Sequence, residues 1–345
     1  MWDKALLKWG SVFRPEKETC DVFSELRKAE RILVVPSDRP GGFFLGIPVY
    51  KGIRQSYPEA EISIVCQEHL ATLARQIPDF DDIITAELDA GPFWKSPASR
   101  LTRSLRSRRF DLAICLGSDC SFRLGMVCAR SGARLRVGFS RPGPEGWFNI
   151  EIECNDRNAY EGGHYEVLSD LLRLDRGGNA GWSVPEARAW EVRCRYFFGE
   201  FASGNVVGID LSRRDGKGMA RRQVEDIIRG LMEAGNRAIL FFTLAERKQV
   251  DYFRSIYGNR ILALDLQDLY EVAALLEGCR AVISCNSDLL HLSIFLKVPA
   301  VAIFDEDPGR WIHPGNDRVA VVRTKDIGTV KISEVLKALD QAATE

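Results

Sequence analysis

The chain has 345 residues, a formal net charge of −1 at pH 7, and 46% hydrophobic and 28% charged residues. This length accommodates two domains of ordinary size, and the composition is that of a soluble globular protein. The near-zero net charge argues against nucleic-acid binding over the whole surface. No apolar run reaches the roughly 20 residues that span a bilayer, and the N-terminal residues lack the layout of a signal peptide.

The nine cysteines are scattered, and no CxxC pair occurs. Several of them, such as Cys66 and Cys115, fall inside apolar runs that predict strands. Free buried thiols of this kind are typical of a reducing compartment, so we expect a cytoplasmic protein. The four histidines are dispersed, and we therefore do not expect a dedicated zinc site.

Residues 1–30 precede the first predicted strand. They combine tryptophan, leucine, valine and phenylalanine with basic residues such as Lys4 and Lys8 in a loosely amphipathic pattern. We interpret this extension as a helix packed on the first domain. The alternative is peripheral contact with the inner face of the cytoplasmic membrane.

The first half of the chain alternates short apolar runs with segments of helical spacing. Strands are predicted at 31–35, 61–65, 82–85, 111–116 and 134–138. Helices are predicted at 43–57, 68–76, 98–109, 122–131 and 164–174. Residues 140–163, rich in Gly, Pro and Asn, are predicted to form a long loop. The alternation indicates an α/β domain with a doubly wound parallel sheet.

A second alternating series follows the linker candidate at 175–181. Strands are predicted at 206–211, 238–243, 260–264, 281–284, 300–304 and 319–322. Helices are predicted at 221–234, 245–257, 269–277, 288–295 and 330–343. We expect two Rossmann-like domains, 1–175 and 176–345, that face a central cleft, with the terminal helix packing back on the first domain.

Polar residues follow the first strand of the second domain, although the sequence has no GxxxxGK[ST] loop and no GxSxG elbow. Ser212 and Lys217 lie in the loop between this strand and the next helix. A lysine ammonium together with loop N–H groups suits a diphosphate. The alternative is a solvated loop lysine. Glu246, after the next strand, is a candidate partner for a ribose or sugar hydroxyl, or an acid that stabilises a helix N-terminus.

The stretch 282–314 predicts a strand, a polar turn, a helix and a second strand, which form a βαβ unit. The turn contains Asn286, Ser287 and Asp288, and His291 lies one turn into the helix. Ligands of such units bind at the carboxyl end of the strand, and the helix N-terminus favours an anion. Alternatively, Asn286 and Ser287 cap the helix and His291 is a core residue.

Basic residues are concentrated in the first domain. Between 95 and 141 they are Lys95, Arg100, Arg103, Arg106, Arg108, Arg109, Arg123, Arg130, Arg134, Arg136 and Arg141. Within that range only Asp111 and Asp119 oppose them. This excess indicates an anionic partner on that side, with a solvated helix face as the alternative. Arg123 is best placed to contact a ligand because it lies just past the strand at 111–116.

Together these segments resemble glycosyltransferase family 9, the ADP-heptose:lipopolysaccharide heptosyltransferases, along nearly the whole chain from residue 31. The resemblance rests on ILVVPSDRPGGFFLGIPVY, RRFDLAICLGSDC, HYEVLSDLLRL and PAVAIFDEDPGRWIHP. Ser212 and Lys217 match the family's phosphate loop, with Met219 and Ala220 in place of its Trp-Pro. Its donor motif, Asp-[Ser/Thr]-Gly-x-x-His, appears as Asn286-Ser287-Asp288-Leu289-Leu290-His291.

The resemblance implies a GT-B fold. It also implies an inverting, metal-independent transfer of a sugar to a lipopolysaccharide core or a related cell-surface saccharide, with ADP-heptose as the expected donor. It implies an anionic, lipid-linked acceptor on the N-terminal domain, at Gly41, Gly42 and Arg123. It implies donor binding in the C-terminal domain, at Ser212, Lys217, Glu246, Asn286, Ser287, Asp288, Leu289 and His291.

Besides Met219 and Ala220, the chain departs from the family pattern at three positions. The family's Gly-Asp pair, whose acid is the candidate base, aligns with Gly41-Gly42, and glycine cannot transfer a proton. Asp38 in the same loop is our candidate base, provided that it comes within about 3 Å of the acceptor hydroxyl. Asn286 replaces an acid and Asp288 a glycine. A catalytically silent relative that binds a nucleotide sugar or a partner enzyme is therefore the alternative.

Overall fold

The computed structural model describes residues 22–37, 41–75, 77–86, 96–118, 122–140, 146–154, 156, 159–175, 206–213, 217–266 and 269–342. The chain divides into two compact units, Met1–Ala180 and Gly181–Glu345. Residues 176–181 of the predicted linker and residues 1–21 of the N-terminal extension lie outside the described residues.

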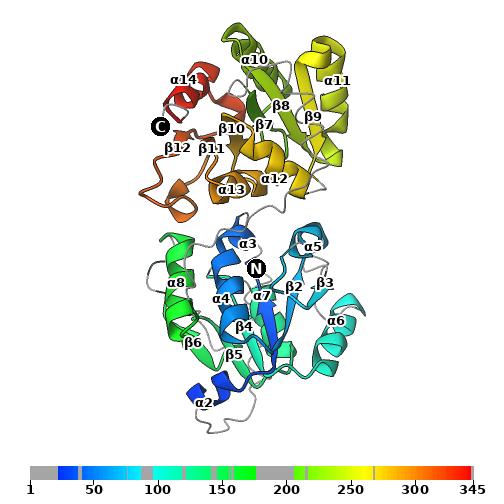
Figure 1. Cartoon of the computed structure of the whole chain (residues 1–345), viewed down its shortest axis with the longest axis vertical. Coiled ribbons are helices and arrows are strands. Elements are labelled where there is room, and N and C mark those ends of the chain that lie inside the picture. The colour runs from blue at the N-terminus through cyan, green and yellow to red at the C-terminus, as the bar shows by residue number, and fades with distance from the viewer. Residues whose placement is uncertain are drawn as a thin grey trace. The chain divides into compact units, whose positions relative to one another are not determined.

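The N-terminal unit has a six-stranded sheet of order β3-β2-β1-β4-β5-β6, in which every pairing is parallel. Its strands are β1 (Arg31–Val35), β2 (Glu61–Cys66), β3 (Asp82–Thr85), β4 (Leu112–Cys115), β5 (Leu135–Phe139) and β6 (Ile150–Ile152). Its helices are α2 (Val22–Arg27), α3 (Gly42–Leu45), α4 (Ile47–Ser56), α5 (Glu68–Ala74), α6 (Ser96–Ser107), α7 (Phe122–Arg130) and α8 (Glu161–Leu171), and they flank the sheet (Figure 1).

The C-terminal unit has a second parallel sheet, of order β12-β11-β10-β7-β8-β9. Its strands are β7 (Val206–Asp210), β8 (Arg237–Phe242), β9 (Ile261–Asp265), β10 (Ala281–Cys285), β11 (Ala300–Phe304) and β12 (Val319–Arg323). Its helices are α10 (Arg221–Glu233), α11 (Arg247–Tyr257), α12 (Leu269–Glu277), α13 (Asp288–Phe295) and α14 (Ile332–Ala342), with short 3-10 turns η2 (Leu244–Glu246), η3 (Gly258–Arg260), η4 (Pro308–Arg310) and η5 (Ile327–Thr329).

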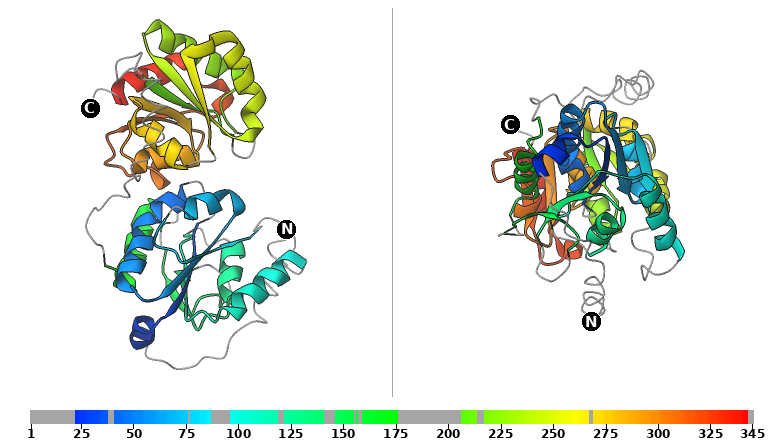
Figure 2. Two further views of the ribbon diagram at one scale, coloured as in Figure 1. Left: turned by 45° about the vertical axis from the view of Figure 1, so that its right-hand side comes forward. Right: turned by 90° about the horizontal axis from the view of Figure 1, so that it is seen from below.

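Both sheets follow one strand order. In each unit the first strand lies inside the sheet, the next two lie on one side of it, and the last three lie on the other. Figure 2 shows from two further directions that the strands run through each unit with helices outside them. Residues such as Ile32, Val207 and Ile283 are fully buried because helices cover both faces of the sheets. The predicted α/β class with two doubly wound parallel sheets is confirmed.

Three elements differ from the sequence prediction. The helix predicted at 43–57 is two helices, α3 and α4, that meet at Gly46. A Cβ at Gly46 would lie 2.4 Å from the Tyr50 hydroxyl oxygen, so a side chain there would clash. The loop predicted at 140–163 contains β6, which pairs with β5. The helix predicted from 164 starts at Glu161.

The terminal helix α14 packs on its own unit. It contacts β10, β11, β12 and α10, and buries Val335 and Leu339 in the core of the C-terminal unit. This packing covers the outer strands of the sheet with an apolar helix face.

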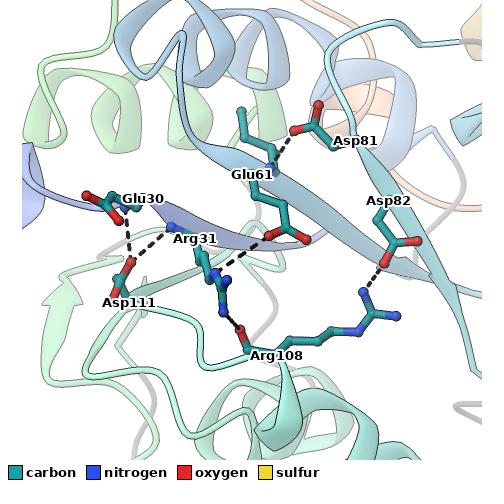
Figure 3. Close-up of polar contacts among 8 residues, drawn as sticks. Glu30, Arg31, Glu61, Asp81, Asp82, Arg108 and Asp111 are labelled. Atoms are coloured by element: carbon teal, nitrogen blue, oxygen red, sulfur yellow. Dashed lines mark hydrogen bonds and ion pairs between the residues drawn. The ribbon is translucent and has the colours of Figure 1, made fainter.

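Ion pairs and hydrogen bonds connect the strands at the amino edge of the N-terminal sheet (Figure 3). The Asp111 carboxylate accepts from the Arg31 backbone N–H at 2.9 Å. The Arg31 guanidinium donates to the Arg108 carbonyl at 3.0 Å and lies 3.6 Å from the Glu61 carboxylate. Arg108 pairs in turn with Asp82. Arg108, one of the basic residues predicted to meet an anionic partner, therefore has an acidic partner within the protein.

Candidate functional site

The carboxyl edge of the C-terminal sheet has a topological switch point between β7 and β10. These strands pair directly, but the chain continues from β7 to β8 on one side and from β10 to β11 on the other. Loops that leave in opposite directions create the crevice in which ligands of such sheets bind. The loop after β7 carries Ser212 and Lys217, and the turn after β10 carries Asn286 and Ser287. The sheet thus brings the two predicted groups to one edge.

A buried carboxylate, Asp210, joins the two sides of this switch point. It ends β7 and is 3% exposed. One carboxylate oxygen accepts from the Ser212 backbone N–H at 2.9 Å and from the Ser212 hydroxyl at 2.6 Å. The other accepts from the Ser284 hydroxyl at 2.7 Å and from the Ser287 hydroxyl. Burial raises the pKa of Asp210, although the hydrogen bonds from the three serines oppose that rise.

Asp210 is not among the residues predicted from the sequence, because it lies within an apolar strand run. The signal was present: it is the one acid in Val206–Leu211, and Ser212 follows it by two residues. An aspartate that accepts from the backbone two residues later is a common turn device. Asp210 therefore orients Ser212 and Ser287, both of which were predicted to bind the donor.

Ser287 is the N-cap of α13. Its backbone is extended and its hydroxyl oxygen accepts from the Leu290 backbone N–H at 3.2 Å. The capping alternative for this residue is thus observed. Asp288 lies in the first turn of the helix, and the side chain of Leu289 is buried in the core.

His291 and Asn286 form a chain of contacts toward the turn after β11. The Nε2 atom of His291, which is 2% exposed, lies 3.0 Å from Oδ1 of Asn286. The Asn286 side-chain amide donates to the Glu306 carboxylate at 2.8 Å. The ring of Trp311 contacts the His291 ring edge-on, with 5.9 Å between centroids. Asn286 is therefore held between the helix and the next loop.

Lys217 faces a carboxylate from the same edge of the sheet. Its Nζ atom lies 2.7 Å from Oδ2 of Asp305, the residue that follows β11. The Lys217 side chain is 65% exposed and that of Asp305 is 20% exposed. The ammonium predicted to bind a diphosphate is thus paired with an acid of the chain itself.

Glu246 lies at the carboxyl end of β8, next to β7 in the sheet. Its carboxylate accepts from the Thr243 backbone N–H at 3.1 Å and from the Thr243 hydroxyl at 2.6 Å. The Thr243 hydroxyl oxygen accepts from the Ala245 N–H at 3.4 Å in return. This reciprocal arrangement is a capping box, which matches the helix-end alternative for Glu246.

The first loop of the N-terminal unit reaches α3 through Gly41 and Gly42. Gly41 has φ of 70° and serves as the N-cap of α3, a left-handed conformation that favours glycine. A Cβ at Gly42 would lie 2.5 Å from the Ser37 Cβ and 2.7 Å from the Ser37 hydroxyl. The space for a side chain at position 42 is thus filled by Ser37, which is itself buried. Asp38, the candidate base, lies outside the described residues.

A second buried carboxylate, Glu161, lies near this loop at the start of α8. The Ser118 hydroxyl donates to it at 2.5 Å. Tyr165, on the same helix, is buried, and its hydroxyl lies 3.5 Å from the Gly42 carbonyl. Burial, together with the neighbouring Glu161 charge, raises the pKa of Tyr165 well above its ordinary value. Glu161 is not among the residues predicted from the sequence, because residues 140–163 were predicted to form a loop.

Several basic residues of the N-terminal unit have structural roles. Arg134 pairs with Glu25 at 2.8 Å. Arg136 is buried and donates to the Trp147 carbonyl at 2.7 Å. Arg123, at the start of α7, is exposed. Lys95, Arg141 and the side chain of Arg100 lie outside the described residues. Arg123, which was predicted to contact the acceptor, is thus exposed to solvent, whereas Arg136 is buried.

Comparison with known proteins finds a family that part of the chain matches. Residues 225–340 match the model of glycosyltransferase family 9 (heptosyltransferase). The chain is 21% identical to lipopolysaccharide heptosyltransferase 2 of Escherichia coli (strain K12) over 311 residues, which are 85% of this chain and 88% of that protein. Residues 225–340 thus resemble glycosyltransferase family 9, and the chain over most of its length is similar to a lipopolysaccharide heptosyltransferase. These similarities support a glycosyltransferase, as the resemblance implied.

Solved structures support the fold. The glycosyl transferase family 9 protein of Veillonella parvula DSM 2008 superimposes with a TM-score of 0.71 at 17% identity, over 91% of this chain and 97% of that one. The E. coli heptosyltransferase WaaC with ADP-2-deoxy-2-fluoro heptose gives a TM-score of 0.66 at 15% identity, over 90% of this chain and 99% of that one. The GT-B architecture of the family is thus confirmed. Among the described residues, no helix has the length and apolar character needed to cross a membrane.

Proposed function

We propose that this glycosyltransferase transfers a heptose from ADP-heptose to a lipopolysaccharide core or a related cell-surface saccharide, with inversion at the anomeric carbon and without a metal. Support comes from the family and from the E. coli relative that is named for heptose transfer to lipopolysaccharide. The observation that carries the proposal is the gathering of Ser212, Lys217 and the capped N-terminus of α13 at one switch point. This combination suits a nucleotide diphosphate.

In the proposed reaction an acceptor hydroxyl attacks the anomeric carbon from the side opposite the diphosphate. The bond between that carbon and the diphosphate oxygen breaks, and ADP leaves. Lys217 and the N-terminus of α13 stabilise the charge that develops on the diphosphate, which is the role a metal has in other enzymes. Asp38 takes the hydroxyl proton in this proposal, and Glu246 binds the ribose.

The remaining predicted contacts divide between the two units. Asn286, Asp288 and His291 complete the donor site in this proposal. Gly41-Gly42 and Arg123 contact the acceptor, an anionic saccharide linked to a lipid. Such an acceptor places the enzyme in the cytoplasm, in peripheral contact with the inner face of the membrane.

A panel of nucleotide sugars tests the proposal. Isothermal titration calorimetry would compare ADP-heptose with ADP-glucose, UDP-glucose and GDP-mannose, followed by transfer assays on core saccharides. We expect tightest binding to ADP-heptose, weaker binding by Lys217→Ala, and loss of transfer with unchanged donor affinity for Asp38→Asn. If none of the donors binds, the proposed function is wrong.

One further outcome would favour the catalytically silent alternative. Ser37 fills the space at Gly42, where the family pattern has its acid. Binding of ADP-heptose without transfer to any acceptor would be the result expected of a silent relative. Transfer that survives Asp38→Asn would remove Asp38 from the mechanism and leave the donor assignment intact.

A further inference from the structure

Two acids of the turn after β11 contact two residues of the proposed donor site. Asp305 pairs with the Lys217 ammonium at 2.7 Å, and Glu306 accepts from the Asn286 side-chain amide at 2.8 Å. Both contacts join a hydrogen-bond donor of the site to a carboxylate oxygen. These two donors are the groups that would otherwise be directed at phosphate oxygens.

The strand order explains how these acids reach the site. β11 lies next to β10, which lies next to β7, so three successive strands end at the same edge. Lys217 belongs to the loop after β7, Asn286 to the turn after β10, and Asp305 and Glu306 to the turn after β11. Lys217 and Asp305 therefore pair across the end of the intervening strand, at the switch point itself.

The next residue, Asp307, is bound differently. It accepts from the Gly309 backbone N–H at 3.1 Å as the N-cap of η4, and pairs with Arg323 on β12 at 2.9 Å. Its contacts thus lie away from Lys217 and Asn286. Asp307 thus holds the turn at η4, while Asp305 and Glu306 contact the proposed donor site.

A carboxylate and a phosphate oxygen are equivalent partners for an ammonium group. A diphosphate that approaches Lys217 meets the negative charge of Asp305 at hydrogen-bond distance from the same ammonium, and like charges that close repel each other. A diphosphate therefore competes with Asp305 for Lys217, and one that approaches Asn286 competes with Glu306.

We propose that Asp305 and Glu306 are internal competitors of the donor diphosphate. They occupy Lys217 and Asn286 in the empty enzyme, leave them when the donor binds, and return when the nucleoside diphosphate departs. This inference rests on the proposed function, because it assigns a regulatory contact to the same donor site. Asp305 has the larger effect, because its pair joins two opposite charges, whereas Glu306 accepts from a neutral amide.

Calorimetric titration of the full chain with ADP, and separately with inorganic pyrophosphate, tests the inference. Loss of an exposed ion pair and of the carboxylate charge should tighten binding of both ligands to Asp305→Asn by about two- to tenfold. Glu306→Gln should show a smaller gain. The Asp305→Asn gain should decrease in 1 M NaCl, where charges are screened beyond about 3 Å.

Asp307→Asn is the matched control. It removes the same charge from the same turn, retains a side chain that can cap η4, and releases neither Lys217 nor Asn286. Its ligand affinity should equal that of the wild type. Thermal unfolding of each variant checks that the C-terminal unit is intact.

The outcomes separate the two proposals. If ADP binds to both proteins and its affinity for Asp305→Asn is unchanged or weaker, the inference is overturned and the proposed function remains in place. Tighter pyrophosphate binding by Asp305→Asn without any ADP binding supports the competition and overturns the nucleotide assignment. If the variant gains affinity for neither ligand, the internal competition is refuted. An equal gain in Asp307→Asn would also refute it, because net charge alone would then account for the effect.

Discussion

Replacing Asp210 with alanine should loosen the C-terminal sheet at its switch point. The carboxylate accepts from the Ser212 N–H, the Ser212 hydroxyl and the hydroxyls of Ser284 and Ser287. Alanine accepts none of these bonds. Because Ser287 also caps α13, the perturbation extends from β7 to β10 and into the proposed donor site.

The size of the effect follows from how many donors lose their partner. Each buried donor left unpaired costs about 1–3 kcal/mol. Ser284 and Ser287 lie 2.9 Å apart and can pair with each other, and Ser284 also lies 2.9 Å from the Cys285 carbonyl. Ser212 is only partly buried, so water can replace part of what its donors lose, and removal of a buried charge offsets a further part of the cost. We expect a net destabilisation of about 2 kcal/mol.

Hydrogen exchange followed by mass spectrometry can resolve this loss within a chain of two units. Peptides from β7, β10 and the start of α13 should lose about 30-fold in protection, which corresponds to about 2 kcal/mol. Peptides from the N-terminal sheet should be unaffected. Asp210→Asn retains an acceptor oxygen and should lose less protection from exchange than Asp210→Ala does. If Asp210→Ala keeps protection within twofold of the wild type, the cluster does not hold β7 to β10 and our reasoning is wrong.

Other predictions concern acidity and packing. Burial raises the pKa of Asp210 above 3.8, so the folded state binds the carboxyl proton more tightly than the unfolded chain does. The stability of the wild type should therefore fall, relative to that of Asp210→Asn, as the pH rises from about 4 through the raised pKa. Urea titrations at several pH values measure this difference. Burial, and to a lesser extent the nearby charge of Asp210, raises the pKa of the Cys285 thiol to about 12. Iodoacetamide at pH 8 should therefore label this thiol only after the protein unfolds. Rapid labelling of the native protein would contradict the burial of Cys285. Gly42→Asp should lower the free energy of unfolding by about 1–3 kcal/mol, because the new Cβ would clash with Ser37. The double variant Ser37→Gly/Gly42→Asp should recover most of that loss. A melting temperature of Gly42→Asp equal to that of the wild type would exclude the clash.

The strands could be predicted because most of them are continuous apolar runs between helices. The exception, β6, has three residues, one of them an exposed glutamate, and so lacks a recognisable period. The break between α3 and α4 lies at Gly46, two residues before Pro48, which has no backbone N–H to donate. Local patterns thus predict long elements, whereas a short strand such as β6 depends on its pairing with β5.

The candidate site divides in the same way. Ser212, Lys217 and Ser287 were placed at the correct sheet edge because the position of a loop after a strand follows from the chain order. Their partners could not be predicted, since Asp210 meets Ser284 across 74 positions and Lys217 meets Asp305 across 88. Such pairings depend on strand order, which a single sequence does not specify.

The common strand order of the two units has a consequence for how this protein can vary. Among the described residues, the core around Val207 and Ile283 is made of residues after 205, and the core around Leu33 and Ala113 of residues before 150. The described neighbours that can compensate a substitution inside one of these cores therefore come from its own half of the chain. Substitutions in the two cores can thus accumulate at different rates.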